Sequence, residues 1–371
     1  MVGEFGASRV LVLYGGGSAV ESGLLGRVTD SLKQEGVPFV ALGGVKPNPT
    51  LSFAEGAVKL CREEHLDFLL AVGGGSVIDT AKSAACSLAN PETPLWDFQT
   101  GKAVPRRPSF PVGVVLTIAA AGSEGSDSSV LTNDRTGEKR GFNSPVNRPV
   151  FALMDPELTY SLPPRQTACG VVDIMMHTLE RYFSTDVTCE TTDAVAEALL
   201  RTVIRCGPVV MKEPSQYEAR SEIMWCGTLS HSDLTGLGRP KSFVVHQMGH
   251  ILSGRFDLPH AESLSCLFCQ WAREVYKSGI PRFARYAREV WNISETDDEK
   301  AALSGIAATE RFFRELSMPV SFGEAQMGVQ RDEDVVSMAR DCSWEGKRQV
   351  GTFHPLDEAG ILRVFQASNH S

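Results

Sequence analysis

The chain is predicted to fold as an α/β amino-terminal domain with a parallel sheet, followed by an all-α domain. Three observations support this prediction. Short apolar runs alternate with helix-like segments between Arg9 and Met154, which is typical of a parallel sheet between helices. After Leu162–Arg165, runs typical of strands give way to long amphipathic patterns. The length of 371 residues also favours two domains. We expect a Rossmann-like domain over residues 1–163 and a helical domain over residues 164–371.

The first half of the chain supplies the strands of the expected sheet. Strands are predicted at Arg9–Tyr14, Phe39–Leu42, Asp67–Val72, Phe110–Ile118, Val130–Leu131 and Val150–Met154. Helical patterns lie between them, through Leu24, Val28 and Leu32, over Phe53–Glu64, and from Val77 onward. A turn at Asn133–Gly137 separates the last two predicted strands.

The second half is expected to be helical from Val172 to about Phe313. Further helices are predicted over Tyr276–Trp291, Ala301–Leu316 and Asp332–Cys342, whereas Gly346–Ser371 is weakly patterned.

Composition excludes several classes of protein. A net charge of −9 argues against nucleic acid or an anionic membrane as the main partner. Nine cysteines, an odd number, are typical of reduced thiols, and we expect Cys266 and Cys269 to serve core packing. No apolar run approaches the ~18 residues of a membrane span. We therefore expect a cytoplasmic protein.

The histidines carry the first chemical signal. His246 and His250 are four residues apart, so a helix would place both imidazoles on one face. Ser253 and Gly254 predict the end of that helix, and Asp257–His260 predicts a loop that brings in a third imidazole. Such a pair is also compatible with helix capping or a surface position. A metal site requires further ligands.

Asp173 and His177 supply these ligands. They are also four residues apart, among apolar residues at helical spacing, where a carboxylate and an imidazole are costly to bury unless they are paired or bound to metal. Together with His246 and His260 they would give one oxygen and three nitrogen ligands, which suits Zn²⁺ or Fe²⁺. His250 would remain to carry a proton.

Two glycine-rich turns carry the second signal. Gly15, Gly16, Gly17 and Ser18 follow the first predicted strand, and Gly73, Gly74, Gly75 and Ser76 follow the third. Such strand-to-helix turns expose backbone N–H groups and favour a pyrophosphate. Asp79 is expected either to contact the cofactor or to form a capping box with Ser76. No acid directly follows Tyr14, which favours NADP(H) over NAD(H).

With these motifs in place, the chain resembles the iron-containing alcohol dehydrogenase family, and most closely its NADPH-dependent aldehyde reductase and butanol dehydrogenase branch. The resemblance covers roughly residues 9–365. The motifs that carry it are Pro47–Thr50, Leu69–Lys82, Ala121–Glu124, Leu162–Gln166, Gly170–His177 and His246–His260.

The resemblance implies a fold similar to that of dehydroquinate synthase, with a cleft between two domains and a homodimer. It implies the four metal ligands above, His250 beside the nicotinamide, and cofactor contacts from both glycine-rich turns, Asp79, Thr117 and Lys139. The sequence departs from the family pattern at Ala121, where the family has a threonine whose hydroxyl is expected to contact the cofactor, so a lower affinity for the cofactor is expected.

The expected function is reversible hydride transfer between NADP(H) and a small aldehyde or primary alcohol such as butanal or butanol. A divalent metal, Fe²⁺ or Zn²⁺, would polarise the carbonyl. The alternatives are a lyase resembling dehydroquinate synthase and a dinucleotide sensor without turnover.

Overall fold

The computed structural model describes residues 1–185 and 187–371 and divides the chain into two compact units, Met1–Thr159 and Tyr160–Ser371. The predicted boundary between residues 163 and 164 coincides with the start of the first long helix of the second unit, α6 (Pro164–Tyr182). Among the described residues, no helix is both long enough and apolar enough to cross a membrane.

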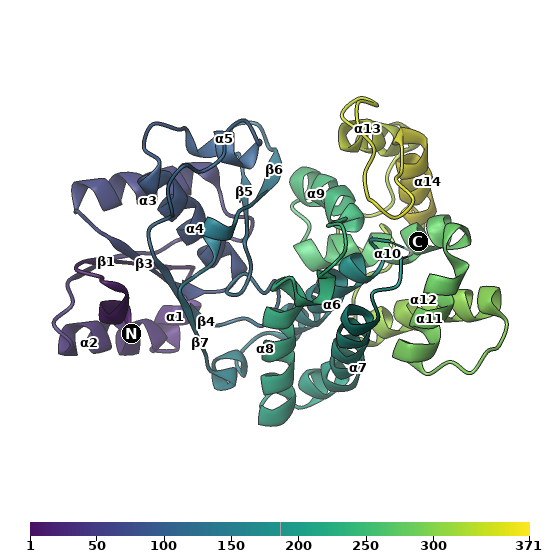
Figure 1. Ribbon diagram of the computed structural model, residues 1–371, viewed down its shortest axis with the longest axis horizontal. Helices are drawn as coiled ribbons and strands as arrows, with labels where there is room; N and C mark the ends of the chain where they lie inside the picture. Colours follow the sequence, from purple (N-terminus) through teal and green to yellow (C-terminus); the bar gives the residue numbers. More distant parts are fainter. Residues whose placement is uncertain (186) are drawn as a thin grey trace. The chain divides into compact units, whose positions relative to one another are not determined.

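The first unit is built on a parallel sheet of five strands (Figure 1). The strands are β1 (Val10–Tyr14), β2 (Phe39–Leu42), β3 (Phe68–Gly73), β4 (Val112–Leu116) and β7 (Phe151–Met154). Their order is β2-β1-β3-β4-β7, and every neighbouring pair is parallel. All residues of β3 and β4 are buried, as expected for central strands covered on both faces. The predicted fold class is confirmed.

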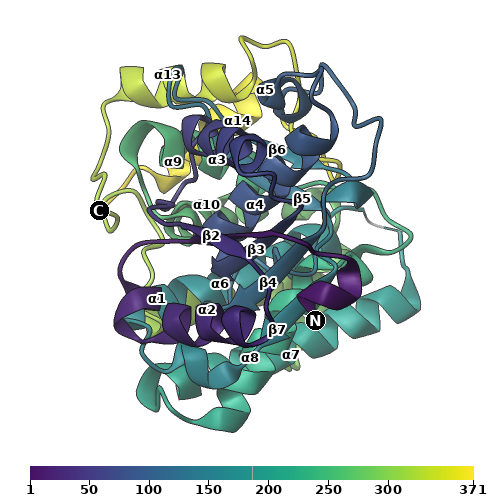
Figure 2. The ribbon, with the colours of Figure 1, turned by 90° about the vertical axis from the view of Figure 1, so that its left-hand side faces the viewer.

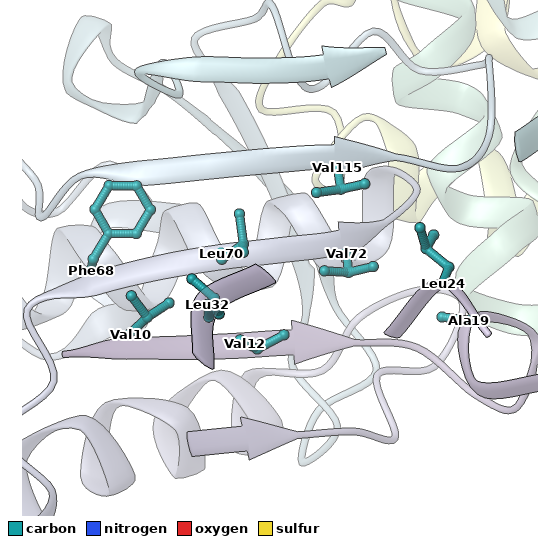
Figure 3. Packing of buried hydrophobic residues seen from close by; sticks show 9 residues of the cluster. All are labelled: Val10, Val12, Ala19, Leu24, Leu32, Phe68, Leu70, Val72 and Val115. Atoms are coloured by element: carbon teal, nitrogen blue, oxygen red, sulfur yellow. The ribbon is translucent and has the colours of Figure 1, made fainter. Parts of the chain in front are cut away.

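Helices cover the two faces of this sheet. On one face, α1 (Ser18–Glu21) and α2 (Leu24–Gln34) cover Val10, Val12, Phe68, Leu70 and Val72 (Figure 3). The alternate residues of β1 and β3 point to the opposite face because strand side chains alternate. There the helices are α3 (Leu51–Glu63), α4 (Gly75–Ala89) and α5 (Leu95–Gln99), and Figure 2 shows α3 and α4 across the sheet from α2.

A separate antiparallel hairpin adjoins α4. It consists of β5 (Ser128–Thr132) and β6 (Lys139–Asn143). The sequence placed Val130–Leu131 within the main sheet and predicted no strand at Lys139–Asn143, so this part of the prediction was wrong. The turn at Asn133–Gly137 closes the hairpin through the Asn133 amide and the Glu138 carbonyl, 2.7 Å apart.

The second unit is helical, as predicted. Its helices are α6, α7 (Glu190–Lys212), α8 (Tyr217–His231), α9 (Val244–Phe256), α10 (His260–Val275), α11 (Ile280–Trp291), α12 (Asp298–Glu315), α13 (Asp332–Cys342) and α14 (Glu358–Ser368). Short 3-10 turns η1 (Val2–Phe5), η2 (Pro145–Asn147), η3 (Pro156–Thr159), η4 (Leu234–Gly236) and η5 (Tyr276–Ser278) complete the chain. The sequence missed α14, which begins where the Asp357 carboxylate accepts the Gly360 amide hydrogen at 2.8 Å.

Cys266 and Cys269 lie on the buried side of α10 and pack within the helical core. Burial raises the pKa of the Cys269 thiol to about 12, so this thiol stays protonated at neutral pH. The prediction that these two cysteines serve packing is confirmed.

Candidate metal and dinucleotide sites

The helix α6 carries Asp173 and His177 into the core of the second unit. Pro164 occupies its first turn, where a missing N–H costs nothing. The apolar sequence around the two polar residues is buried, and Asp173 and His177 are 5% and 3% exposed. Nδ1 of His177 lies 2.9 Å from the Asp173 carbonyl oxygen and donates to it, so Nε2 is the nitrogen of His177 that can bind a ligand.

The helices α9 and α10 carry the other imidazoles. His246 and His250 lie one turn apart on α9, as predicted. The helix does not end at Ser253 and Gly254; it continues to Phe256 and ends at Asp257, whose φ of 50° is left-handed. His260 is therefore not in a loop but is the first residue of α10, directly after Pro259.

Three of the four predicted ligands converge. Oδ1 of Asp173 lies 4.0 Å from Nε2 of His246 and 3.9 Å from Nε2 of His260. One ligand atom from each of the three residues lies within 4.8 Å of the others. Ligands held roughly 2.1 Å from a tetrahedral ion would be about 3.4 Å apart, so a small inward movement would close this cluster around one cation. The residues present therefore fit the predicted metal.

His177 and His250 lie beside the cluster rather than within the three-residue group. The ring of His177 lies 4.7 Å from that of His246, centroid to centroid, and stacks at 4.2 Å on His231. Burial, assisted by His246 and Arg181, lowers the pKa of His177 well below its usual range. His177 is therefore the neutral imidazole that metals bind. His250 is half-buried, with its ring 5.9 Å from that of His260.

The sequence did not identify Glu180, a carboxylate that lies against this cluster. It is 1% exposed on α6 and accepts the backbone N–H of His246 at 3.2 Å. It also contacts Nδ1 of His246 and the amide of Val245. Burial raises the pKa of the Glu180 carboxyl, and the two backbone donors and Arg181 act in the opposite direction. The position of Glu180 in the sequence, three residues after His177, does not indicate that it contacts α9.

In the first unit, the predicted cofactor loops meet at one edge of the sheet. Tyr14 pairs with Val72 and Gly73 with Leu116, so β1, β3 and β4 end side by side. The turn Gly15–Ser18 follows β1, the turn Gly73–Ser76 follows β3, and Thr117 follows β4. The Thr117 amide donates to the Gly73 carbonyl at 3.2 Å. The carboxyl edge of a parallel sheet is where α/β proteins bind nucleotides.

The second turn requires glycine because other atoms approach its backbone closely. A Cβ on Gly73 would lie 2.5 Å from Cγ2 of Val77, and one on Gly74 would lie 3.1 Å from Cδ1 of Ile118. A Cβ on Gly75 would lie 3.3 Å from the methyl carbon of Ala121. The turn opens α4, a helix of 15 residues whose first amide groups can face an anion.

Asp79 does not form the capping box that the sequence allowed. The helix α4 begins at Gly75 with Gly74 as its N-cap, so Ser76 already lies inside the helix. The carboxylate of Asp79 instead accepts the Ser123 hydroxyl at 2.5 Å and the Val130 amide at 3.0 Å. It thereby ties the loop after β4 to α4.

Lys82, which the sequence analysis did not single out, ties the same loop. It is fully buried, and Nζ donates to the carbonyls of Ser123, Ser126 and Ser128 at 2.5, 3.1 and 2.8 Å. Burial lowers the pKa of Lys82 to about 8. The nearby acids Asp79, Glu124 and Asp127 act in the opposite direction, and Arg148 acts in the same direction as burial.

Two further side chains define the surroundings of the dinucleotide loops. Nζ of Lys139, a predicted cofactor contact at the start of β6, donates to Oδ1 of Asn48 at 2.9 Å. The carboxylate of Glu21 folds back over the first turn: a Cβ on Gly17 would lie 2.6 Å from Oε1 of Glu21. Glu21 lies beyond the residues directly after Tyr14, on which the prediction of NADP(H) is based.

Comparisons with known proteins agree over nearly the whole chain. Residues 1–156 match the family described as iron-containing alcohol dehydrogenase, and residues 167–369 match the C-terminal domain of the Fe-containing alcohol dehydrogenase family. The NADPH-dependent aldehyde reductase YqhD of Escherichia coli is 37% identical, with 97% of this chain and 92% of that protein covered. The NADH-dependent butanol dehydrogenase A of Clostridium acetobutylicum is 34% identical with the same coverage.

Solved structures of related proteins have a similar fold. A crystal structure of E. coli YqhD matches with a TM-score of 0.92 at 37% identity, covering 97% of this chain and 92% of that one. The NADH-dependent butanol dehydrogenase A of Thermotoga maritima matches with a TM-score of 0.94 at 32% identity, covering 100% and 93%.

The fold and these matches define a metal-containing, dinucleotide-dependent alcohol or aldehyde oxidoreductase. The chain belongs to the iron-containing alcohol dehydrogenase family. This membership confirms the predicted family and enzyme class, and it favours the dehydrogenase over the lyase and the sensor. It implies a nicotinamide dinucleotide and one divalent metal of the iron type.

Proposed function

We propose that the protein reduces small aldehydes to primary alcohols, and catalyses the reverse reaction, with a metal held by Asp173, His177, His246 and His260. The observation that carries this proposal is the convergence of the buried Asp173 and His246 with the half-buried His260 in the second unit. A divalent cation at this position would act as a Lewis acid on the substrate oxygen. Fe²⁺ and Zn²⁺ both suit one carboxylate and three imidazoles.

The side chains of the second unit would bind and orient the substrate oxygen. His177 and His246 are buried, and their rings lie against those of the partly buried His231 and Phe243, which would limit the access of water to this side of the cluster. His250 is half-buried and lies beside His260, where an imidazole can carry the proton of the alcohol.

The turns at the carboxyl edge of the sheet would hold the dinucleotide. We assign the second turn, Gly73–Ser76, to the pyrophosphate because it opens α4, whose first backbone N–H groups can face an anion. Asp79 has both carboxylate oxygens engaged within the protein, so its proposed role is to hold the loop that contains Thr117 and Ala121.

The choice of coenzyme depends on two features that act in opposite directions. The backbone of Gly15–Ser18 supports the prediction of NADP(H), because the turn offers donors and space for a 2′-phosphate. The Glu21 carboxylate over Gly17 favours NAD(H), because it would repel that phosphate and could accept the ribose hydroxyls. NADP(H) remains the prediction from the sequence, and NAD(H) is the second candidate. The homodimer and the cytoplasmic location also remain predictions.

The test is an assay of the purified protein reloaded with Fe²⁺ or with Zn²⁺. Oxidation of NADPH and of NADH is followed with and without butanal. Oxidation that depends on both the aldehyde and the metal supports the proposal. Binding of the dinucleotide without turnover of any short aldehyde, with either metal, would instead favour a sensor.

A further inference from the structure

The carboxylate of Glu180 joins two helices at the metal cluster. Glu180 lies on α6, three residues after His177, and is 1% exposed. Its two oxygens face three hydrogen-bond donors of α9: the amides of Val245 and His246, and Nδ1 of His246. Buried polar groups need hydrogen-bond partners, and here one carboxylate supplies the acceptor for three donors at the start of one helix. We therefore infer two structural roles for Glu180.

The first role of Glu180 is to cap the amino terminus of α9. The residue before this helix, Phe243, has a left-handed backbone with φ 53°, and its side chain forms no cap. The first amides of a helix have no acceptor within the helix. Glu180 accepts two of them from a neighbouring helix and so replaces the missing cap.

The second role of Glu180 is to fix which nitrogen of the His246 ring carries the hydrogen. Each oxygen of Glu180 already accepts a backbone N–H of α9, so Glu180 acts as an acceptor here, and its contact with His246 places the ring hydrogen on Nδ1. The lone pair then belongs to Nε2. This is the nitrogen that lies 4.0 Å from Oδ1 of Asp173. Metal-binding histidines are commonly held in one tautomer in this way.

We propose that Glu180 is a positioning residue for the metal: it holds the start of α9 and directs the Nε2 lone pair of His246 at the cation. This inference rests on the proposed function, because it assumes that the cluster holds a metal. Glu180 itself is not a ligand. Its contribution is a preformed ligand direction, which raises the affinity for the metal by reducing the reorganisation on binding.

The experiment compares the binding of Co²⁺ by the wild-type protein, Glu180→Gln and Glu180→Asp. Glutamine cannot accept from both the helix amides and Nδ1–H, because one of its two terminal groups is a donor. We expect Glu180→Gln to bind Co²⁺ roughly 10–100-fold more weakly in competition with a chelator. Its visible Co²⁺ absorption should also change in intensity and position. Glu180→Asp, which retains a carboxylate, should recover part of the affinity.

Glu197→Gln is the matched control. Glu197 is also a buried carboxylate of the second unit, 3% exposed on α7, and it accepts from Tyr182 at 2.8 Å and from Arg285 at 2.7 Å. This variant should lose thermal stability but keep the Co²⁺ affinity and spectrum of the wild type. Wild-type affinity and spectrum in Glu180→Gln would overturn the inference. Failure of the wild-type protein itself to bind Co²⁺ would instead contradict the proposed function.

A second measurement needs no variant and covers the case in which Glu180→Gln does not fold. In the Zn²⁺-loaded wild-type protein labelled with ¹⁵N-histidine, NMR distinguishes a nitrogen that carries hydrogen from one bound to metal. We expect His246 to show hydrogen on Nδ1 and metal on Nε2. Metal on Nδ1 would overturn the inference.

Discussion

Oδ1 of Asp173, in the middle of α6, lies 3.9 Å from Nε2 of His260, the first residue of α10. The two residues are far apart in the sequence, and the buried Asp173 carboxylate would be costly to bury without a partner. Their proximity, together with His246, is the basis of the proposed metal site.

Loss of a ligand should abolish metal retention. Replacing His246 or Asp173 by alanine removes one ligand of the cluster, and we expect the purified variant to lose bound metal on dialysis together with its aldehyde reduction. Metal content is measured by mass spectrometry alongside the activity. His370→Ala, at an exposed position near the carboxyl terminus, is the control and should retain both. Full activity in a metal-free His246→Ala protein would contradict the Lewis-acid role.

His250 should affect turnover without affecting the metal. If it carries the proton, His250→Ala should lower kcat by roughly 100-fold or more near neutral pH, because general acid catalysis typically contributes that much. Its metal content should match that of the wild type, since His250 is not one of the four proposed ligands. The dependence of kcat on pH should also lose the limb due to an imidazole. A variant with unchanged kcat and an unchanged pH profile would show that His250 is structural.

Glu21 should decide the balance between the two coenzymes. Glu21→Gln removes the negative charge over Gly17, so the ratio of kcat/KM for NADPH to that for NADH should rise, by roughly tenfold for about 1.4 kcal/mol of removed repulsion. Binding of each coenzyme, measured by its fluorescence, should change in the same direction. Glu35→Gln, an exposed acid at the end of α2, is the control. An unchanged ratio in Glu21→Gln would place the 2′-phosphate elsewhere.

Lys82 should make stability depend on pH above neutrality. Its pKa of about 8 in the folded protein lies below the ordinary value of 10.5, so the unfolded chain binds more protons between these two pH values. Burying this charge lowers the free energy of unfolding. This unfavourable contribution is fully present below pH 8 and declines as the pH rises towards 10.5. The free energy of unfolding should therefore rise by at most about 1.4 kcal/mol per pH unit in this range.

The measurement is the apparent Tm of the wild type relative to Lys82→Met between pH 7 and about 9.5. The apparent Tm of the wild type should increase relative to that of Lys82→Met as the pH rises through 8. Lys33→Met, at an exposed position on α2, should show no such trend. A constant difference between the wild type and Lys82→Met would show that Lys82 keeps its ordinary pKa.

Much of this fold could be predicted from the sequence because local patterns determine it. The apolar runs Arg9–Tyr14 and Asp67–Val72 are each followed by glycines, and the structure bears out both strands, β1 and β3. The four-residue spacings of Asp173 and His177, and of His246 and His250, correctly predicted helices that present each pair. The hairpin of β5 and β6 was misplaced because strand pairing depends on distant partners, which a single short run does not specify.

The contacts that sequence analysis missed all depend on tertiary structure. The Glu180 carboxylate meets the start of α9, and Asp79 and Lys82 meet the loop at Ser123, so each partner comes from another element. No spacing within one helix predicts such contacts. Similarly, α9 continues through Gly254 because a glycine can adopt the helical conformation, and the helix ends only at the left-handed Asp257.

The most direct test of the metal site is anomalous diffraction from crystals of the metal-loaded protein, recorded on both sides of the iron and zinc absorption edges. We predict a single strong peak about 2.0–2.2 Å from the ligand atoms of Asp173, His246 and His260, with His177 completing the set. Catalytically active crystals with no peak among these residues, or with the peak at another site, would contradict this prediction.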